Sequence, residues 1–143
     1  MKVKICAVLV ISFFSAIVAF AQSSSLNQQA SAQYRAAEKA EAALKEKAES
    51  ERSRTEYLRV IQSYQRVYLI TPHTGWADNA LTSIARLYEE IQDPKDAVKT
   101  LQFLLREYPQ TPFRDVAQRD VARLSGINEA TLRETNSVEN IRF

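Results

Sequence analysis

The chain has 143 residues, and its 19 basic and 17 acidic side chains give a formal charge of +2, for which Lys2 and Lys4 account. This balance lacks the basic excess of a nucleic-acid-binding protein, so we expect no nucleic-acid partner. Cys6 is the only cysteine, which excludes an internal disulfide framework and a thiolate metal site.

Residues 1–21 have the layout of a secretory signal peptide. Two lysines precede an apolar stretch over residues 5–20, and Ala19 and Ala21 form a small-x-small cleavage site before a polar run. An uncleaved membrane anchor is the alternative, although the stretch is near the lower limit for spanning a bilayer and has no basic flank on its far side. Cys6 lies inside the stretch, away from the position of an acylated lipoprotein cysteine. We therefore expect secretion, with no stable membrane span after cleavage.

Residues 22–29 are polar and predict a flexible leader in front of a helical domain over residues 30–125. The first helix is expected over residues 30–48, where Ala, Glu, Lys and Gln dominate, since all four favour the helical state. Its apolar side is thin, which places this helix at the edge of a stack of helices.

The polar residues 49–53 are expected to form a turn, with Ser50 or Ser53 as the N-cap of a second helix. They include no glycine or proline, so one long helix through to residue 70 is the alternative. The second helix should end near Pro72, because the residue before a proline is pushed out of the α region. Its wide apolar stripe consists of Tyr57, Val60, Ile61, Tyr64, Val67, Tyr68 and Leu69.

The third and fourth helices have clear start signals. Thr74 is the expected N-cap of a helix that begins near Trp76. Asp93 can cap the fourth helix, with Pro94 at its first position, and this helix should end at Tyr108 before the next proline.

A fifth helix is expected to start with Thr111 as its cap and Pro112 at its first position, and to run to Leu124. Gly126 stands where a left-handed C-terminal cap belongs, and residues 126–143 then form a tail. The period-two alternation of a strand is not convincing anywhere before the last few residues. The domain is therefore predicted to be all-α.

The sequence repeats itself at a spacing of 37 residues (72 to 109). The segments Pro72 to Ala80 and Pro109 to Ala117 share proline, threonine, an aromatic residue, aspartate and alanine in register. Periods of this length mark repeat architectures, in which each unit buries its apolar face only by stacking on a neighbour. The repeat therefore predicts a binding scaffold.

Residues 78–111 resemble one tetratricopeptide repeat. The matching positions of its two helices are Leu81, Ile84, Ala85 and Tyr88, then Ala97, Leu101, Leu104 and Pro109, of which Leu104 is larger than the family norm. The loop pattern Pro-x-Thr-x-aromatic-x-Asp is similar to a variant in bacterial envelope proteins, such as the Tol-Pal-associated coordinator and the outer-membrane assembly lipoprotein. The resemblance implies a short helical-hairpin solenoid of about five helices in the periplasm, which binds an envelope protein or peptide.

A narrower resemblance is to the N-terminal helical region of secreted N-acetylmuramoyl-L-alanine amidases. It rests on Glu51 to Tyr57, Tyr64 to His73 and Phe103 to Pro109. In that family the repeats precede an AMIN domain, a β-rich cell-wall targeting module, and then a zinc hydrolase domain. Ser137 to Phe143 are similar to the first strand of an AMIN domain, with chance similarity as the alternative. This resemblance implies a peptidoglycan-associated protein whose catalytic domain would follow the present chain.

No residue pattern indicates an active site or a cofactor. His73 is the only histidine, and a zinc site would need at least two further ligands of suitable spacing. We therefore expect no metal or cofactor and assign His73 to an interhelical loop.

The concave face lined by the first helices of each repeat is the candidate recognition site, because repeat scaffolds generally bind their partners there. Arginines around a shallow groove could hold a peptide carboxylate through paired hydrogen bonds, and an ordinary charged surface is the alternative. Few repeats give a small surface, which homo-oligomerisation would extend. The candidate residues are Asn79, Thr82, Ser83, Arg86, Arg119 and Arg123.

The sequence thus favours a non-catalytic interaction scaffold of the bacterial periplasm or cell envelope that serves the cell-wall or outer-membrane machinery. The N-terminal part of a peptidoglycan amidase, without its zinc domain, is the alternative. A coiled-coil adaptor fits less well, because Lys45 and Lys47 interrupt an a/d seam in the first helix.

Overall fold

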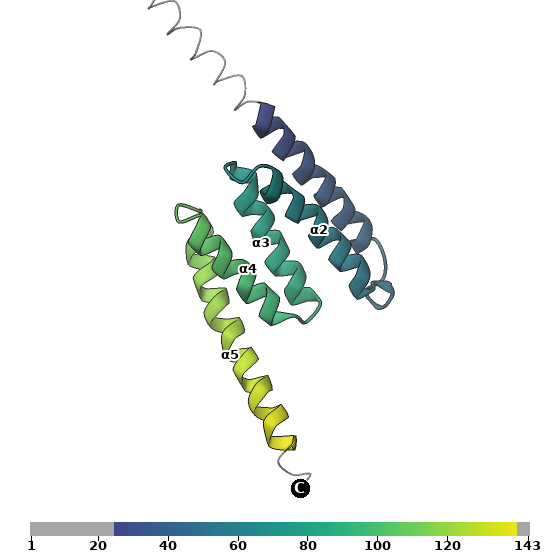
Figure 1. Cartoon of the computed structure of the whole chain (residues 1–143). Helices are drawn as coiled ribbons and strands as arrows, with labels where there is room; N and C mark the ends of the chain where they lie inside the picture. The colour runs from purple at the N-terminus through teal and green to yellow at the C-terminus, as the bar shows by residue number, and fades with distance from the viewer. Residues whose placement is uncertain (1–24, 140–143) are drawn as a thin grey trace, which may run out of the picture.

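The structure is a computed structural model that describes residues 25–139, with side chains up to residue 126. This part of the chain contains helices and turns but no strand, which confirms the all-α class. Consecutive long helices run in opposite directions and stand side by side (Figure 1). They are the N-terminal helix (residues 25–45), the short 3-10 helix η1 (Glu49–Glu51), α2 (Arg54–Ile70), α3 (Gly75–Glu90), α4 (Pro94–Glu107) and α5 (Arg114–Glu139).

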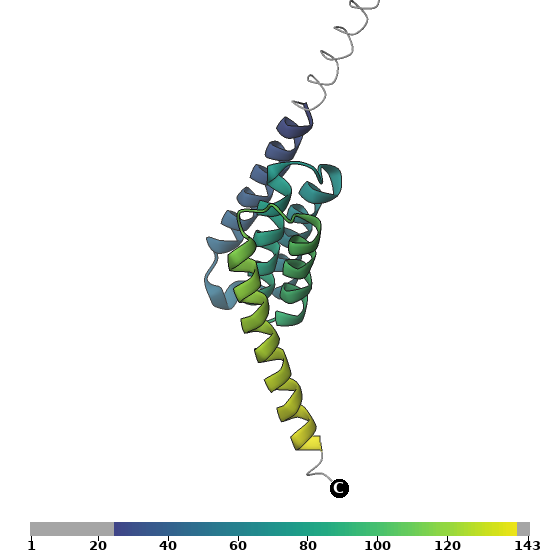
Figure 2. The same cartoon turned by 90° about the vertical axis from the view of Figure 1, so that its left-hand side faces the viewer.

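The helices form two layers. The N-terminal helix and α5 lie toward one side of the molecule and α4 toward the other, so that the chain alternates between the layers (Figure 2). Ion pairs from α3 to both the N-terminal helix and α5 place α3 in the first layer. The first layer therefore consists of the N-terminal helix, α3 and α5, and the second layer of α2 and α4.

A break separates the first helix from α2 around the predicted turn at residues 49–53, although no glycine or proline enforces it. The first helix ends at residue 45, before its predicted end at residue 48, and the turn contains the 3-10 helix η1. A capping box begins α2: the Ser53 hydroxyl accepts from the Glu56 amide at 3.3 Å, and the Glu56 carboxylate accepts from the Ser53 amide at 2.9 Å. Arg52 donates to the carbonyls of Lys47 at 3.0 Å and Lys45 at 2.9 Å, which satisfies acceptors at the end of the N-terminal helix. Side-chain hydrogen bonds therefore stabilise the end of the N-terminal helix and the start of α2, where the sequence has no glycine or proline.

The predicted flexible leader differs from the structure over residues 25–29, which are helical and continuous with the N-terminal helix. Tertiary contacts explain the difference. Ala30 is fully buried, and the Trp76 indole donates to the Asn27 side-chain oxygen at 3.1 Å. Polar composition alone does not reveal that another helix covers this segment. The predicted signal peptide over residues 1–21 lies outside the described residues.

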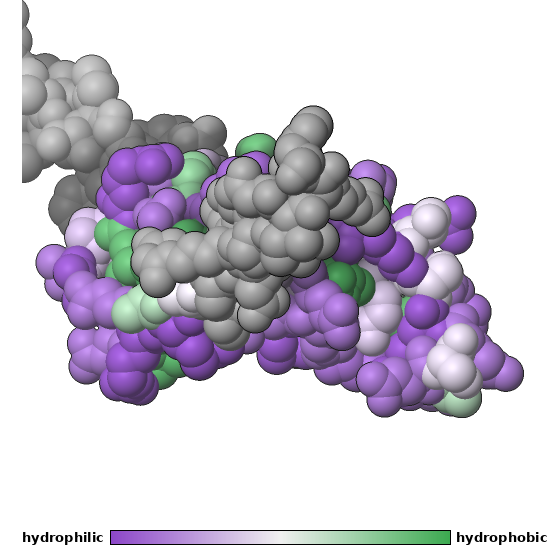
Figure 3. All heavy atoms as spheres, turned by 90° about the horizontal axis from the view of Figure 1, so that it is seen from below, coloured by the Kyte–Doolittle hydropathy of each residue, from purple (hydrophilic) through white to green (hydrophobic). Residues whose placement is uncertain are grey.

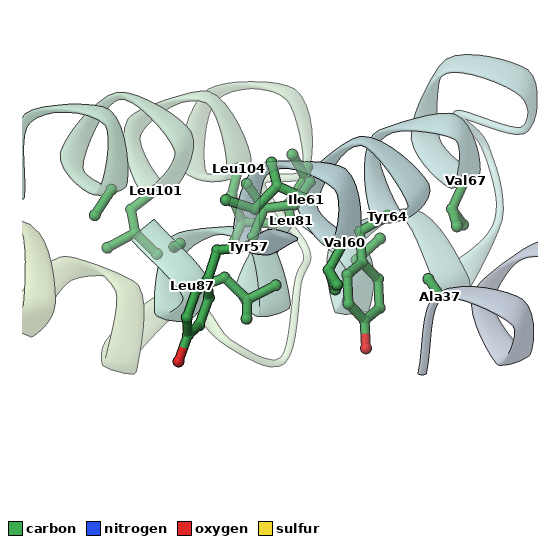
Figure 4. Close-up of a cluster of buried hydrophobic side chains, with 14 of the residues drawn as sticks. Ala37, Tyr57, Val60, Ile61, Tyr64, Val67, Leu81, Leu87, Leu101 and Leu104 are labelled. Atoms are coloured by element: carbon green, nitrogen blue, oxygen red, sulfur yellow. The ribbon is translucent and has the colours of Figure 1, made fainter. Parts of the chain in front are cut away.

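One hydrophobic core runs through all the long helices. The apolar stripe predicted on α2 is buried at Tyr57, Val60, Ile61, Tyr64 and Val67, whereas Leu69 is 68% exposed. In Figure 4 Tyr57 and Ile61 of α2 lie among leucines of α3 and α4, and the hydroxyl groups of Tyr57 and Tyr64 point out of the cluster. The buried residues of α3 and α4 are Ala77, Asp78, Ala80, Leu81, Ile84, Ala85, Leu87, Ala97, Leu101 and Leu104.

Of the predicted N-caps of α3 and α4, only that of α4 makes a side-chain capping bond. Asp93 caps α4 as expected, because its carboxylate accepts from the Asp96 amide at 3.2 Å and Pro94 opens the helix. Thr74 is the N-cap residue of α3, but its hydroxyl makes no capping bond. It donates instead to the Thr71 carbonyl at 3.0 Å, which braces the loop before α3.

Helix α5 differs from its prediction at both ends. It begins at Arg114, after Thr111 and Pro112, and it continues through Gly126 to Glu139. No described glycine has a positive φ, so Gly126 is an interior helical residue and not a left-handed cap. Continuing the helix is favoured because a single interior glycine costs only about 1 kcal/mol, and residues 127–139 include good helix formers.

The same extension affects the predicted tail. The segment expected to begin a strand, Ser137 to Phe143, is helical up to Glu139, and residues 140–143 lie outside the described residues.

We expect the substitution Gly126→Ala to stabilise the protein by about 0.5–1 kcal/mol, because alanine loses less backbone entropy in a helix interior. A Cβ at this position would meet no atom within 4 Å. Urea unfolding followed by circular dichroism measures the change. Destabilisation would instead indicate the left-handed cap that the sequence suggested.

Candidate functional site

The six predicted recognition residues lie on one layer of the molecule. Asn79, Thr82, Ser83 and Arg86 belong to α3, and Arg119 and Arg123 belong to α5. Arg123 donates to the Glu89 carboxylate at 2.8 Å, which brings α5 against the exposed side of α3. The six residues therefore belong to two helices of the same layer, and the charges among them are arranged differently from the expectation.

Arg86 is held inside a cluster of four alternating charges. Its two terminal nitrogens donate to Glu41 at 2.8 Å and to Glu90 at 2.7 Å. Lys45 lies between the same two carboxylates, at 2.9 Å from Glu41 and 3.1 Å from Glu90. The cluster joins the N-terminal helix to α3, and each of its cations contacts both of its anions.

Glu41 connects this cluster to the core. It is only 8% exposed, and its second oxygen accepts from the Tyr64 hydroxyl of α2 at 2.8 Å. Burial raises the pKa of Glu41, but the hydrogen bonds from Lys45, Arg86 and Tyr64 outweigh it and hold the pKa below 4.5. Burial, followed by the bond to Glu41, raises the pKa of Tyr64 above its ordinary value. Glu41 is therefore ionised at neutral pH and links three helices.

Arg123 forms a second ion-pair group one helix further along. It contacts Glu89 of α3 at 2.8 Å and Asp120 of its own helix at 2.9 Å. Hydrogen bonds to Glu89 and then to Asp120 raise the pKa of Arg123. Two of the three arginines assigned to a carboxylate groove are thus already paired with carboxylates of this chain.

Arg119 is the remaining predicted arginine. It is exposed one turn before Arg123 on α5 and has no ion pair with a side chain in residues 25–126. Within that part of the chain it is the predicted groove cation best placed to receive an external anion.

The small polar candidates bond mainly within the fold. The Asn79 side-chain amide donates to the Gly75 carbonyl at 2.8 Å, and the Thr82 hydroxyl donates to the Asp78 carbonyl at 2.9 Å. Ser83 is half-buried, and its hydrogen bond slightly offsets the raised pKa of Tyr64. These three side chains lie on the surface of α3, but their hydrogen bonds within the protein leave few donors and acceptors for a partner.

The sequence analysis placed Tyr64 in the apolar stripe of α2 but did not predict that Glu41 and Tyr64 belong to this site. A signal existed, because Glu41 lies four residues after Ala37 and three before Leu44, on the apolar side of its helix. A carboxylate at such a position predicts a buried partner. The sequence could not identify that partner, since Tyr64 is 23 residues away on another helix.

A cleft of about 660 Å³ lies between the two repeated loops. The hydroxyl of Thr111 donates to the buried carboxylate of Asp78 at 3.1 Å and so joins the second loop to α3. His73 lies at the rim in the first loop, as predicted from the sequence. The apolar lining includes Tyr68, Leu69, Pro72, Phe103, Tyr108 and Pro109.

No group of His, Cys, Asp and Glu side chains among the described residues could hold a metal ion. In the same part of the chain no helix is long and apolar enough to cross a membrane. Comparisons with protein-family models, with curated proteins and with solved structures find no match to this chain.

Replacing Glu41 with leucine is expected to destabilise the protein by about 1–2 kcal/mol, because Tyr64 loses its buried acceptor and Arg86 loses a partner. The expected loss of stability is small because the Arg86 side chain is 46% exposed to solvent, where water can replace its lost partner. Glu38→Leu is the matched control, since Glu38 is exposed on the same helix. Equal urea midpoints for the two variants would show that the Glu41 cluster contributes nothing to stability.

Stability should also fall in acid. A carboxyl group with a lowered folded-state pKa contributes stability above its unfolded pKa and loses it as the pH falls through the folded pKa. The folded-state pKa of Glu41 is lowered below its ordinary value of 4.5. The hydrogen bond from Lys47, followed by those from Ser53, lowers the pKa of Glu56 to about 2. Urea midpoints should therefore drop between about pH 4.5 and pH 2, and less steeply in Glu41→Gln. Identical profiles for Glu41→Gln and the natural protein would contradict the assignment.

Proposed function

We propose that this chain is a non-catalytic protein-interaction scaffold of the bacterial periplasm, built from tetratricopeptide-like helical hairpins. Its partner would be a protein or peptide of the cell-wall or outer-membrane machinery. Secretion would follow from the signal-peptide layout of residues 1–21. The compartment and the class of partner rest on fold-level analogy.

The observation that carries this proposal is a structural repeat of one interaction. Arg86 and Arg123 are 37 residues apart (86 to 123), which is the period of the sequence repeat. Each donates at 2.8 Å to a carboxylate of the preceding first-layer helix, Arg86 to Glu41 and Arg123 to Glu89. The two arginines are thus equivalent in the repeat and both bridge successive first-layer helices, as expected of stacked repeats, whereas their acceptors Glu41 and Glu89 are not at equivalent positions.

The recognition surface would be the layer of the N-terminal helix, α3 and α5. Its internal ion pairs neutralise most of the predicted charge, so affinity for a carboxylate would depend chiefly on Arg119. A partner could also compete for Arg86, whose side chain is 46% exposed while it bridges Glu41 and Glu90. The Arg86–Glu90 pair is exposed and contributes about 1 kcal/mol or less, so an external carboxylate could displace Glu90, whereas Glu41 is nearly buried.

Site-specific photo-crosslinking in cells tests this proposal. A photoreactive residue at Arg119 should capture a partner in the periplasmic fraction, whereas one at the exposed Gln102 of α4, in the other layer, should not. Arg119→Glu should weaken recovery of that partner about tenfold, which corresponds to about 1.4 kcal/mol. Equal capture from both positions, or a cytosolic location, would refute the proposal.

A further inference from the structure

The charges of this molecule are distributed unevenly along its length. Three segments that meet at the end where the N-terminal helix begins, residues 25–34, 67–77 and 108–113, contain no Asp, Glu, Lys or Arg. They comprise the start of the N-terminal helix and the α2–α3 and α4–α5 loops with their flanking residues, which all lie at the upper end in Figure 1. We call these three segments the charge-free end.

The opposite end is densely charged. The segment of 12 residues from 45 to 56 carries eight charged side chains, which are Lys45, Glu46, Lys47, Glu49, Glu51, Arg52, Arg54 and Glu56. The α3–α4 connection adds Glu89, Glu90, Asp93, Lys95 and Asp96. The view from this side is dominated by hydrophilic side chains wherever the surface is described (Figure 3).

Exposed apolar side chains follow the same division. Leu26 is 48%, Leu69 is 68% and Ile70 is 45% exposed, and all three belong to the charge-free end. Val116, at 46%, lies in the first turn of α5 beside it. These are the exposed large hydrophobic residues within residues 25–126. All four thus lie at or beside one end of the molecule.

The charge-free end also carries the aromatic residues typical of a membrane interface. Trp76 is half-buried there, with its ring 5.2 Å from that of Tyr34, and the cleft beside it is lined by Tyr68 and Tyr108. The charged residues next to the three segments are Arg35, Arg66, Asp78, Glu107 and Arg114, and Arg114 donates to the Pro109 carbonyl at 3.0 Å. Bringing the three segments themselves to a bilayer would desolvate no charged side chain.

The N-terminal helix begins at this end, and the apolar stretch over residues 5–20 precedes that helix in the sequence. Only four residues, 21–24, separate it from the described helix, and they span at most about 14 Å when extended. We propose that, in the form of the protein that keeps residues 5–20 as an uncleaved anchor, the charge-free end is a membrane-facing surface that rests in the headgroup region of the bilayer.

The tether explains how so small an apolar surface suffices. An embedded stretch holds the charge-free end beside the lipid at high effective concentration, so weak insertion of Leu26, Leu69 and Ile70 is enough for contact. Because the surface lacks charge, the contact should form on zwitterionic lipid and change little with salt. This surface differs from the proposed recognition layer, which runs along the sides of the helices.

Trp76 is the only tryptophan, so its fluorescence reports this end alone. In the full chain reconstituted into phosphatidylcholine vesicles with brominated acyl chains, Trp76 emission should shift to shorter wavelength and be quenched. In Leu69→Glu/Ile70→Glu the protein should stay on the vesicles through residues 5–20, but the quenching should be lost. Ser50→Glu/Thr55→Glu adds equal charge at exposed positions of the opposite end and should be quenched like the natural chain.

Unquenched Trp76 in the natural chain, or equal quenching in all variants, would overturn the proposal. A requirement for anionic lipid would do the same, because it would indicate an electrostatic contact. If the Leu69→Glu/Ile70→Glu variant instead turned a dimer into a monomer in sedimentation without vesicles, a second copy would be the occupant and not lipid. Leu26→Glu, on a different helix, should also lose quenching, which guards against a local folding defect. Capture of a partner at Arg119 is independent of each of these results.

Discussion

Helix α3 contacts α2 and α4 through its buried side and reaches the N-terminal helix and α5 through ion pairs at its surface. Alanines allow the close approach: Ala77, Ala80 and Ala85 are at most 2% exposed, and larger side chains such as Leu87 fill the space between helices. A helix buried on so many sides needs neighbours in both layers. The antiparallel alternation of the chain between the layers supplies them, and the core then extends outward from α3.

Ion pairs join the helices of the first layer at its surface, in addition to apolar contacts such as that between the rings of Tyr34 and Trp76. Its helices meet through Arg86 with Glu41 and Arg123 with Glu89, at the rim of the core. Such pairs are individually weak in solvent, but Glu41 differs because it is nearly buried and also accepts from Tyr64. A partner that binds this layer would meet a surface whose charges are already balanced. Its selectivity would then depend on shape and on exposed side chains that have no ion pair within residues 25–126, such as Arg119.

The second organising feature is the unequal distribution of charged residues between the two ends of the helices. Both repeated loops lie at the charge-free end, and the connections at the other end are rich in charge. The loops at the two ends therefore differ in charge, although they connect similar helices. The proposed recognition layer and the proposed membrane-facing end do not overlap, so the domain could bind a partner along its side while its end rests on lipid.

The sequence by itself determined the helices and most of their boundaries, because these depend on near neighbours along the chain. The stripe on α2, the Asp93 cap with Pro94 and the break after the first helix are local patterns, and all are present. Gly126 was misjudged because a glycine signals a helix end only if the chain turns there, and α5 continues instead.

Only the tertiary structure decided which charges are free. The sequence predicted the six residues of the recognition face, but it could not show that Arg86 and Arg123 are paired with carboxylates 45 and 34 residues away. It also could not show that Asn27 bonds to Trp76, or that three uncharged segments meet at one end. Side chains far apart in sequence become neighbours only through the packing of helices, and no local pattern encodes that distance.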